Sequence, residues 1–246
     1  MPPANNPAQR LADVLIRLKT QDPARSIKES LQSVLSVDDD VEFLHALGYL
    51  VGLPGEIETL VRKVADEHDD VEWLLKWQHK VDGAVRRMWA LTSSTQTVTQ
   101  QYDDADIAYL QACSQTLSRA RVEPRIDADK LVELNNQIDS LYSDLLADTE
   151  MPALLKDFIL GQLDRIRRAV RQYVVHGPVG LEEVLEATLG AIFVKSPKVE
   201  DDSPRVRTYI ERLKTILAHL QLTATTATGM LNTASDAQAA LERWMP

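Results

Sequence analysis

The sequence contains few of the residues that build disulfides, sheets and membrane spans. Its 246 residues include one cysteine, Cys113, nine glycines and three phenylalanines. A single cysteine cannot close an intramolecular disulfide, and the opening MPPANNPAQR lacks the charged and apolar regions of a secretory signal, so we expect a cytoplasmic protein. The longest apolar run, ALGYLVGL at residues 46–53, is far shorter than the roughly 20 residues that cross a bilayer. We therefore expect no transmembrane segment.

The residues that dominate instead favour helices. Alanine, leucine, glutamine, glutamate, lysine and arginine have high helix propensity, and their abundance predicts an all-α protein. A chain of this length buries a core large enough to fold without a disulfide or a metal, and we predict no cofactor. With 37 acidic against 27 basic side chains the formal charge is −10, which opposes general binding to nucleic acids.

Helical periodicity and one polar stretch divide the chain. We expect an N-terminal helical array at residues 1–91, a polar connection at residues 92–102 and a C-terminal antiparallel bundle at residues 103–246. The connection contains TSSTQTVTQQ, which is uncharged, rich in hydroxyl groups and without a helical stripe. Hydroxyl side chains compete for backbone hydrogen bonds, so this segment is a better candidate for a linker than for a helix.

The C-terminal half shows the clearest helical spacing. An apolar register begins at Pro204 and continues toward the C-terminus, either as one long helix or with a break near residues 223–229. In the second case a capping box at Ser235 starts a last helix that ends at Trp244. Residues 127–148 carry apolar side chains at spacings of three and four, which is typical of bundle packing: Leu131, Leu134, Ile138, Leu141 and Leu145.

Two nearly identical hexamers, DDVEFL at residues 39–44 and DDVEWL at residues 69–74, lie thirty positions apart. Helix–turn–helix repeats have periods near this length, and stacked units form a solenoid with a binding face. Each hexamer also matches an N-cap followed by acidic first-turn residues. We interpret them as two similarly capped helices, with a true repeat as the alternative. GLPG at residues 52–55 is expected to end the first of these helices.

One set of residues resembles a metal site. His45 followed by His68 and Asp69 is similar to the order of ligands in metal-dependent HD phosphohydrolases, which are all-α and hold divalent metals with imidazole and carboxylate groups. The resemblance implies hydrolase activity with these three residues as ligands. Here the His-Asp pair lies in the polar stretch ADEHDDVE, which is typical of a loop, so a solvated histidine beside a helix cap is the simpler interpretation.

The candidates for partner binding are three tryptophans and three arginines. Trp73, Trp77 and Trp89 accompany an apolar helical stripe, where such residues are either core or exposed anchors for a partner. The densest basic stretch in this acidic chain is RIRRAVRQYVVH, at residues 165–176. Its arginines either bind a phosphate or pair with the chain's own acids, and the residues concerned are Arg165, Arg168 and Arg171.

The sequence contains no convincing set of catalytic groups but much helical surface. We therefore predict a non-enzymatic module for protein–protein interaction. Such a module acts as an adaptor, a regulator or an assembly subunit, and it binds a partner protein or a second copy of itself through helix faces. The alternatives are a metal-dependent hydrolase that uses His45, His68 and Asp69, and an arginine-mediated binder of phosphate or nucleic acid.

Overall fold

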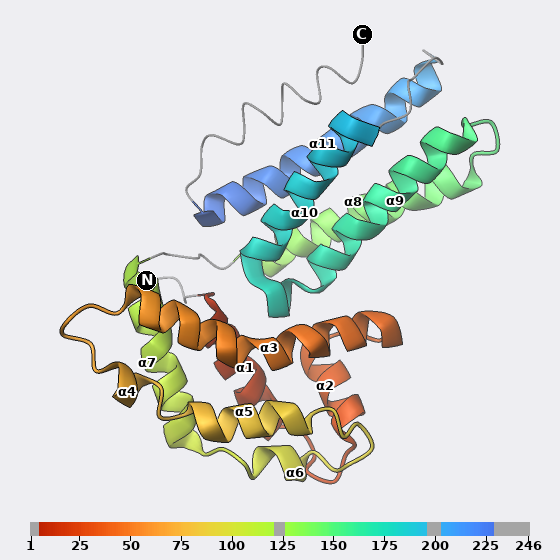
Figure 1. The fold of residues 1–246 in the computed structure, drawn as a ribbon. Coiled ribbons are helices and arrows are strands. Elements are labelled where there is room, and N and C mark those ends of the chain that lie inside the picture. Colours follow the sequence, from red (N-terminus) through yellow and green to blue (C-terminus); the bar gives the residue numbers. More distant parts are fainter. Residues whose placement is uncertain (1–4, 121–125, 196–202, 229–246) are drawn as a thin grey trace. The chain divides into compact units, whose positions relative to one another are not determined.

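The computed structural model describes residues 5–120, 126–195 and 203–228, and helices dominate all three ranges (Figure 1). This confirms the prediction of an all-α protein. None of the helices that it describes is long and apolar enough to cross a bilayer. The chain forms two compact units. Met1–Arg125 and Val174–Gly177 make up unit 1, and Ile126–Tyr173 and Pro178–Pro246 make up unit 2.

Unit 1 is a cluster of helices around a shared apolar core. Its helices are α1 (Pro7–Lys19), α2 (Ile27–Leu35), α3 (Asp40–Val64), α4 (Val71–Leu74), α5 (Gln78–Arg87), α6 (Gln96–Thr99) and α7 (Asp104–Ala120). The side chain of Asn6 caps α1 by accepting the backbone N–H of Gln9 at 3.1 Å. α1 packs against α2, α3 and α7, and it buries Leu11, Leu15 and Leu18. The first helix thus lies at the centre of the packing in unit 1.

The polar stretch at residues 92–101 belongs to unit 1 and is bonded to the start of α2. The backbone N–H of Ile27 donates to the carbonyl oxygen of Ser93 at 2.9 Å. The Thr95 hydroxyl is buried and donates to Oγ of Ser30 at 2.7 Å. These bonds fix a segment that has no apolar stripe. The boundary expected at residues 92–102 therefore differs from the observed one, which falls between residues 125 and 126.

α3 is one continuous helix of 25 residues that passes through GLPG. The stop expected at residues 52–55 is wrong, because the glycines remain helical and Pro54 is buried within the helix. Asp39 and Asp70 each cap a helix start by accepting backbone N–H groups. The first hexamer thus begins the long α3 and the second begins the four-residue α4. Segments with such different helices do not form a repeat, and their similarity is confined to the capped starts.

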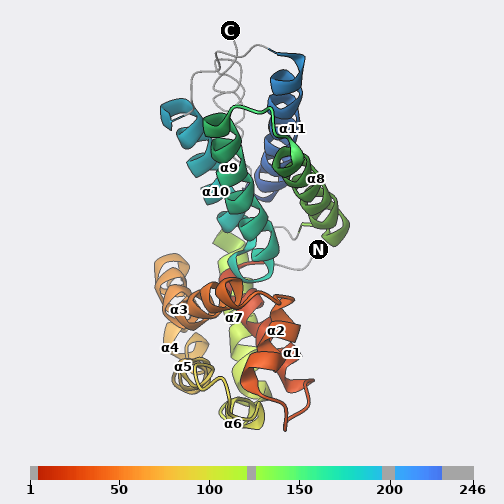
Figure 2. The same cartoon turned by 90° about the vertical axis from the view of Figure 1, so that its right-hand side faces the viewer.

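Unit 2 contains α8 (Ala128–Ala147), α9 (Ala153–Arg171), α10 (Tyr173–Lys195, apart from Val174–Gly177) and α11 (Pro204–Thr228) (Figure 2). α8 contacts both α9 and α11. α11 runs antiparallel to α8, since His219 lies 2.9 Å from Gln137 and Arg205 lies 3.3 Å from Asp148. α11 continues past residue 223 to Thr228, and the helix expected from Ser235 to Trp244 lies outside the described residues. The spacing on α8 is confirmed by burial of Leu134, Ile138, Leu141 and Leu145.

Candidate protein-binding site

The outward face of α3 is exposed and uncharged over about four helical turns. At about 100° per residue its exposed positions fall on one side of the helix, opposite the buried Phe43, Leu47 and Leu50. Exposed helix faces in soluble proteins are normally charged or polar. We call this surface the α3 face, and its residues are Val41, Leu44, His45, Gly48, Gly52 and Gly55. Val41 and Leu44 are the large apolar side chains of this face, and they are 62% and 45% exposed.

Three glycines of the α3 face have no steric reason to be glycine among the described residues. A Cβ atom added to Gly48, Gly52 or Gly55 would meet nothing within 4 Å, and none of the three has a positive φ. Glycine inside a helix costs about 0.5–1 kcal/mol relative to alanine. In return, the missing side chains leave the α3 backbone open to close approach by a second helix.

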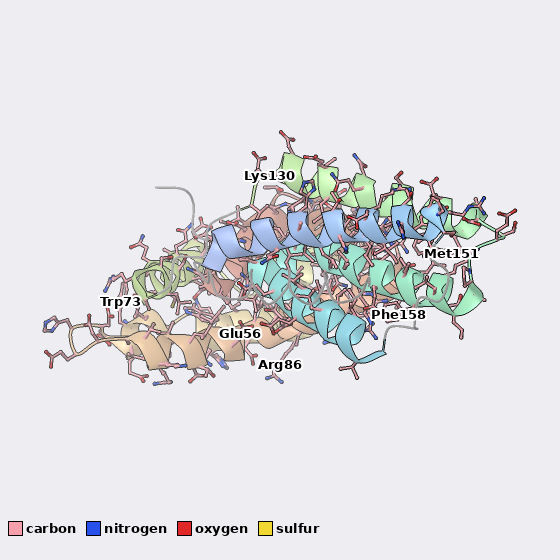
Figure 3. All side chains as sticks on the ribbon, turned by 90° about the horizontal axis from the view of Figure 1, so that it is seen from above. Glu56, Trp73, Arg86, Lys130, Met151 and Phe158 are labelled. Atoms are coloured by element: carbon pink, nitrogen blue, oxygen red, sulfur yellow. The ribbon has the colours of Figure 1, made fainter. Side chains whose placement is uncertain are left out.

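A groove runs beside the α3 face, between α3 and α5. It encloses about 550 Å³ and is lined by Val51, Gly52 and Gly55 from α3 and by His79, Asp82 and Arg86 from α5. Arg86 donates from Nε to Asp82 at 2.7 Å, and its guanidinium extends into solvent (Figure 3). Hydrogen bonds from Gln78 and then Arg62 lower the pKa of the Glu58 carboxyl at the rim. The groove therefore has few side chains beside the glycines of α3 and a rim that carries both signs of charge.

The three predicted tryptophans have different surroundings. Trp73 is 43% exposed, and its ring meets that of Tyr109 edge to face. Trp89 is 50% exposed. Trp77 is fully buried, and its indole N–H donates to Sγ of Cys113 at 3.3 Å. A buried indole has no surface to offer a partner, so Trp77 is a core residue while Trp73 and Trp89 remain candidates.

The three predicted arginines lie on α9 but do not form one cluster. Arg165 and Arg168 are exposed, one turn apart, and have no ion pair within the described ranges. Arg171 lies 4.0 Å from the carboxylate of Asp139. Arg165 and Arg171 are about 120° apart around the axis of α9, and Arg168 lies between them. Arg165 and Arg168 are the two that remain available to an anion.

The structure separates the three predicted metal ligands. His45 is exposed near the start of α3, while His68 and Asp69 follow its far end. The axis rises about 28 Å between His45 and Val64, whereas the ligands of one zinc ion must lie within roughly 2 Å of it. Asp69 instead pairs with Arg119 at 3.2 Å. No group of three His, Cys, Asp or Glu residues in the described part of the chain is placed to hold a metal, so the proposed hydrolase site is not formed.

A polar cluster around the buried Arg10 in unit 1 was not predicted. Arg10 is 2% exposed, and the rings of Tyr49 and His176 stack with 3.9 Å between their centroids. Burial, followed by the negative charge of Glu56, raises the pKa of Tyr49 to about 12. Burial, followed by the positive charge of Arg10 and by repulsion from His45 when that ring is protonated, lowers the pKa of His176 to about 4. Neither group titrates near neutral pH, so the cluster is unsuited to general acid–base catalysis. The position of Arg10 on the apolar side of α1 was the signal in the sequence.

A second hollow lies in unit 2, between α8 and α11. It encloses about 560 Å³, with the buried Ile216 at its floor and Val132, 58% exposed, at its edge. The rest of its lining is polar, and Arg212 is already held by Asp144 at 2.7 Å. This lining brings together no nucleophile and base, so it suggests no reaction.

Comparison with protein-family models, curated proteins and solved structures gave no match. A function must therefore be inferred from the chain's own surface. Among the sites described above, the metal ligands are separated, the cysteine is buried, and the pKa values of Tyr49 and His176 are shifted away from neutral pH. The α3 face is exposed, lacks charge and presents open backbone, and those are properties of a surface that receives another helix.

Proposed function

We propose that the protein is a non-enzymatic module for protein–protein interaction and that the α3 face receives a helix of its partner. The observation that carries this proposal is the uncharged, exposed side of α3 between Val41 and Gly55. Burial of apolar surface drives association, while charged groups at the centre of an interface would have to be desolvated. A helix face without charge avoids that desolvation cost.

The partner's helix is expected to pack its apolar stripe along Val41 and Leu44 and to approach the backbone at the glycines. Helices pack at interaxial distances of about 8–10 Å, and the shorter distances require small residues at the crossing point. Asp82 and Arg86 give the groove beside the α3 face a rim with both signs of charge, which can fix the orientation of the partner. We propose the cytoplasm as the compartment, because the single cysteine is a free, buried thiol.

A pair of lysine substitutions tests the proposal. Gly52→Lys places a charge in the middle of the α3 face, and Gly161→Lys is the matched control on α9. A Cβ at either position meets nothing within 4 Å, so both variants should fold, which circular dichroism would check. Each variant would be expressed in the cells of origin and purified gently, and the mass of the eluting species would be measured by light scattering.

The natural chain and Gly161→Lys are expected to elute with a stoichiometric protein partner or as a dimer. Gly52→Lys is expected to elute near the 27.6 kDa of the single chain. A second, milder variant, Gly52→Ala, should keep the face uncharged but fill the crossing point, and it should weaken the complex without abolishing it. The proposal fails if Gly52→Lys keeps its partner in full, or if the natural chain elutes as a lone monomer.

A further inference from the structure

Trp73 and Tyr109 form an aromatic corner on the surface of unit 1. Trp73 belongs to α4 and Tyr109 to α7, and their rings meet at 81° with 5.0 Å between the centroids. Trp73 is 43% exposed, and Tyr109 is half-buried against the core of the unit, which holds it in place. Aromatic faces carry negative π-electron density and aromatic edges are positive, so the edge-to-face contact holds the two rings in place while the exposed part of Trp73 still meets solvent. An exposed aromatic face attracts a cation rather than an anion.

The charges on the segment around Trp73 also favour a cation over an anion. Five acidic side chains precede or flank Trp73: Asp66, Glu67, Asp69, Asp70 and Glu72. Asp69 is paired with Arg119 at 3.2 Å and Glu72 with Arg62 at 3.4 Å. The other three have no ion pair within the described ranges, and two exposed lysines flank the stretch: Lys63 before Asp66 and Lys76 after Trp73. The balance along this stretch is therefore three acids without an ion pair against two lysines.

We propose that the aromatic corner binds a lysine or arginine side chain presented by a basic segment of a partner protein. The cation packs over the face of Trp73, the ring type that binds cations most strongly. Asp66, Glu67 and Asp70 attract the basic segment and orient it. The same charges repel the phosphates of nucleic acids and of anionic membranes, so a protein segment is the ligand that fits. This contact uses no residue of the α3 face, so it can form whether or not a helix docks there.

A synthetic peptide of alternating lysine and alanine is the probe. The Trp73 indole N–H resonance, assigned by its loss in Trp73→Phe, would be followed in nitrogen–proton correlation spectra during titration with this peptide. We expect this resonance to shift, and we expect Trp73→Ala to raise the Kd by roughly fivefold or more. Tyr109→Phe keeps the aromatic wall and should leave the Kd within about twofold. A peptide whose lysines are trimethylated keeps its charge and should bind at least as well.

Matched controls separate cation binding from general charge attraction. Trp89→Ala removes another exposed indole, 50% exposed, and should not change the Kd. Acetylated lysines carry no charge, so the acetylated peptide should not bind. The double variant Asp66→Asn, Glu67→Gln should weaken binding and reduce its dependence on salt concentration.

Several results would overturn the assignment. One is the absence of any shift of the Trp73 resonance at saturating peptide, and another is equal binding of the acetylated peptide. A third is an unchanged Kd in Trp73→Ala while the double acidic variant loses binding, which would mean that the acidic segment attracts the peptide without the aromatic corner. The Gly52→Lys variant should bind the peptide as the natural chain does. The elution experiment therefore tests the α3 face, and peptide binding tests the aromatic corner separately.

Discussion

The indole N–H of Trp77 donates to Sγ of Cys113 at 3.3 Å, and the same thiol donates to the carbonyl oxygen of Leu74 at 3.2 Å. Both Trp77 and Cys113 are fully buried, and burial raises the pKa of the thiol. A protonated, enclosed thiol is a poor nucleophile. We expect the native chain to react with Ellman's reagent far more slowly than the unfolded chain does, as measured by absorbance with and without denaturant.

Trp77→Phe should loosen this environment. The substitution removes the hydrogen bond to the thiol and leaves a cavity, and it should lower the free energy of unfolding by about 1–3 kcal/mol. The reaction of Cys113 with Ellman's reagent should become faster in proportion. Trp89→Phe, at a half-exposed position, is the control and should change neither quantity. Equal reaction rates in the two variants would contradict the role given to Trp77.

His176 should make unit 1 less stable in mild acid. Its folded pKa of about 4 lies below the unfolded value of about 6.5, and burial is the main cause. Between these values the unfolded chain binds a proton that the folded chain does not. The free energy of unfolding therefore falls as the pH drops from about 6.5 to about 4, and the loss stops below that range. Because the ring is only partly buried, we expect a loss on the order of 1–2 kcal/mol.

Urea unfolding at pH values across this range would measure the effect. His176→Gln cannot take up the proton, so its free energy of unfolding should vary less with pH than that of the natural chain. His68→Gln, at an exposed position in the loop after α3, should keep the full dependence. If the free energy of unfolding depended on pH equally in both variants, the assignment of this dependence to His176 would be wrong.

Gly177 should tolerate no side chain. Its φ of 64° and ψ of −160° form a combination that is essentially restricted to glycine, and a Cβ would lie 2.2 Å from Nη1 of the buried Arg10. Gly177→Ala should therefore destabilise the chain by about 2 kcal/mol or more. Gly161→Ala fills open space inside α9 and should stabilise it by about 0.5–1 kcal/mol. Thermal unfolding of the two variants should shift in opposite directions, and a shift in the same direction would count against the strain at Gly177.

Thr95 should behave as a core residue. Thr95→Val removes a hydroxyl that donates to Ser30 at 2.7 Å, and it leaves the buried Ser30 without that donor. A loss of about 1–3 kcal/mol is expected in urea unfolding. Thr92→Val, at an exposed position, should cost far less. In the natural chain a non-specific protease should not cleave residues 92–101 before unit 1 unfolds, whereas early cleavage there would show that this stretch behaves as a linker after all.

Local pattern predicted those elements whose structure is decided locally. The all-α class, the spacing of apolar residues on α8 and the caps at Asp39 and Asp70 follow from propensity, periodicity and N-terminal hydrogen bonding, which act within a few residues. The misplaced boundary at residues 92–102 has a tertiary cause. The hydrogen-bond partners of Thr95 lie about 65 to 70 positions earlier in the chain, so the local sequence around Thr95 does not predict them.

The residues of the candidate site also divide into those that local pattern predicts and those that depend on tertiary contacts. Trp73 and Trp77 lie one turn apart with similar neighbours, yet one meets solvent and the other meets Cys113 on α7. The sequence hides the α3 face because GLPG predicts a helix stop at residues 52–55. Proline and glycine weaken a helix locally, but the burial of Leu53, Pro54 and Ile57 on the inner side of α3 outweighs that preference.

Unit 1 is discontinuous along the chain. Val175 is 1% exposed within its core, yet it follows α8 and α9 in the sequence. A ribosome adds roughly 5–20 residues per second and delivers the chain from its N-terminus. Residues 126–173 of unit 2 are thus synthesised before the last four residues of unit 1 exist. Unit 1 therefore cannot complete its core until a large part of unit 2 has been synthesised, and for several seconds a nascent chain carries an apolar core with a gap where Val175 belongs.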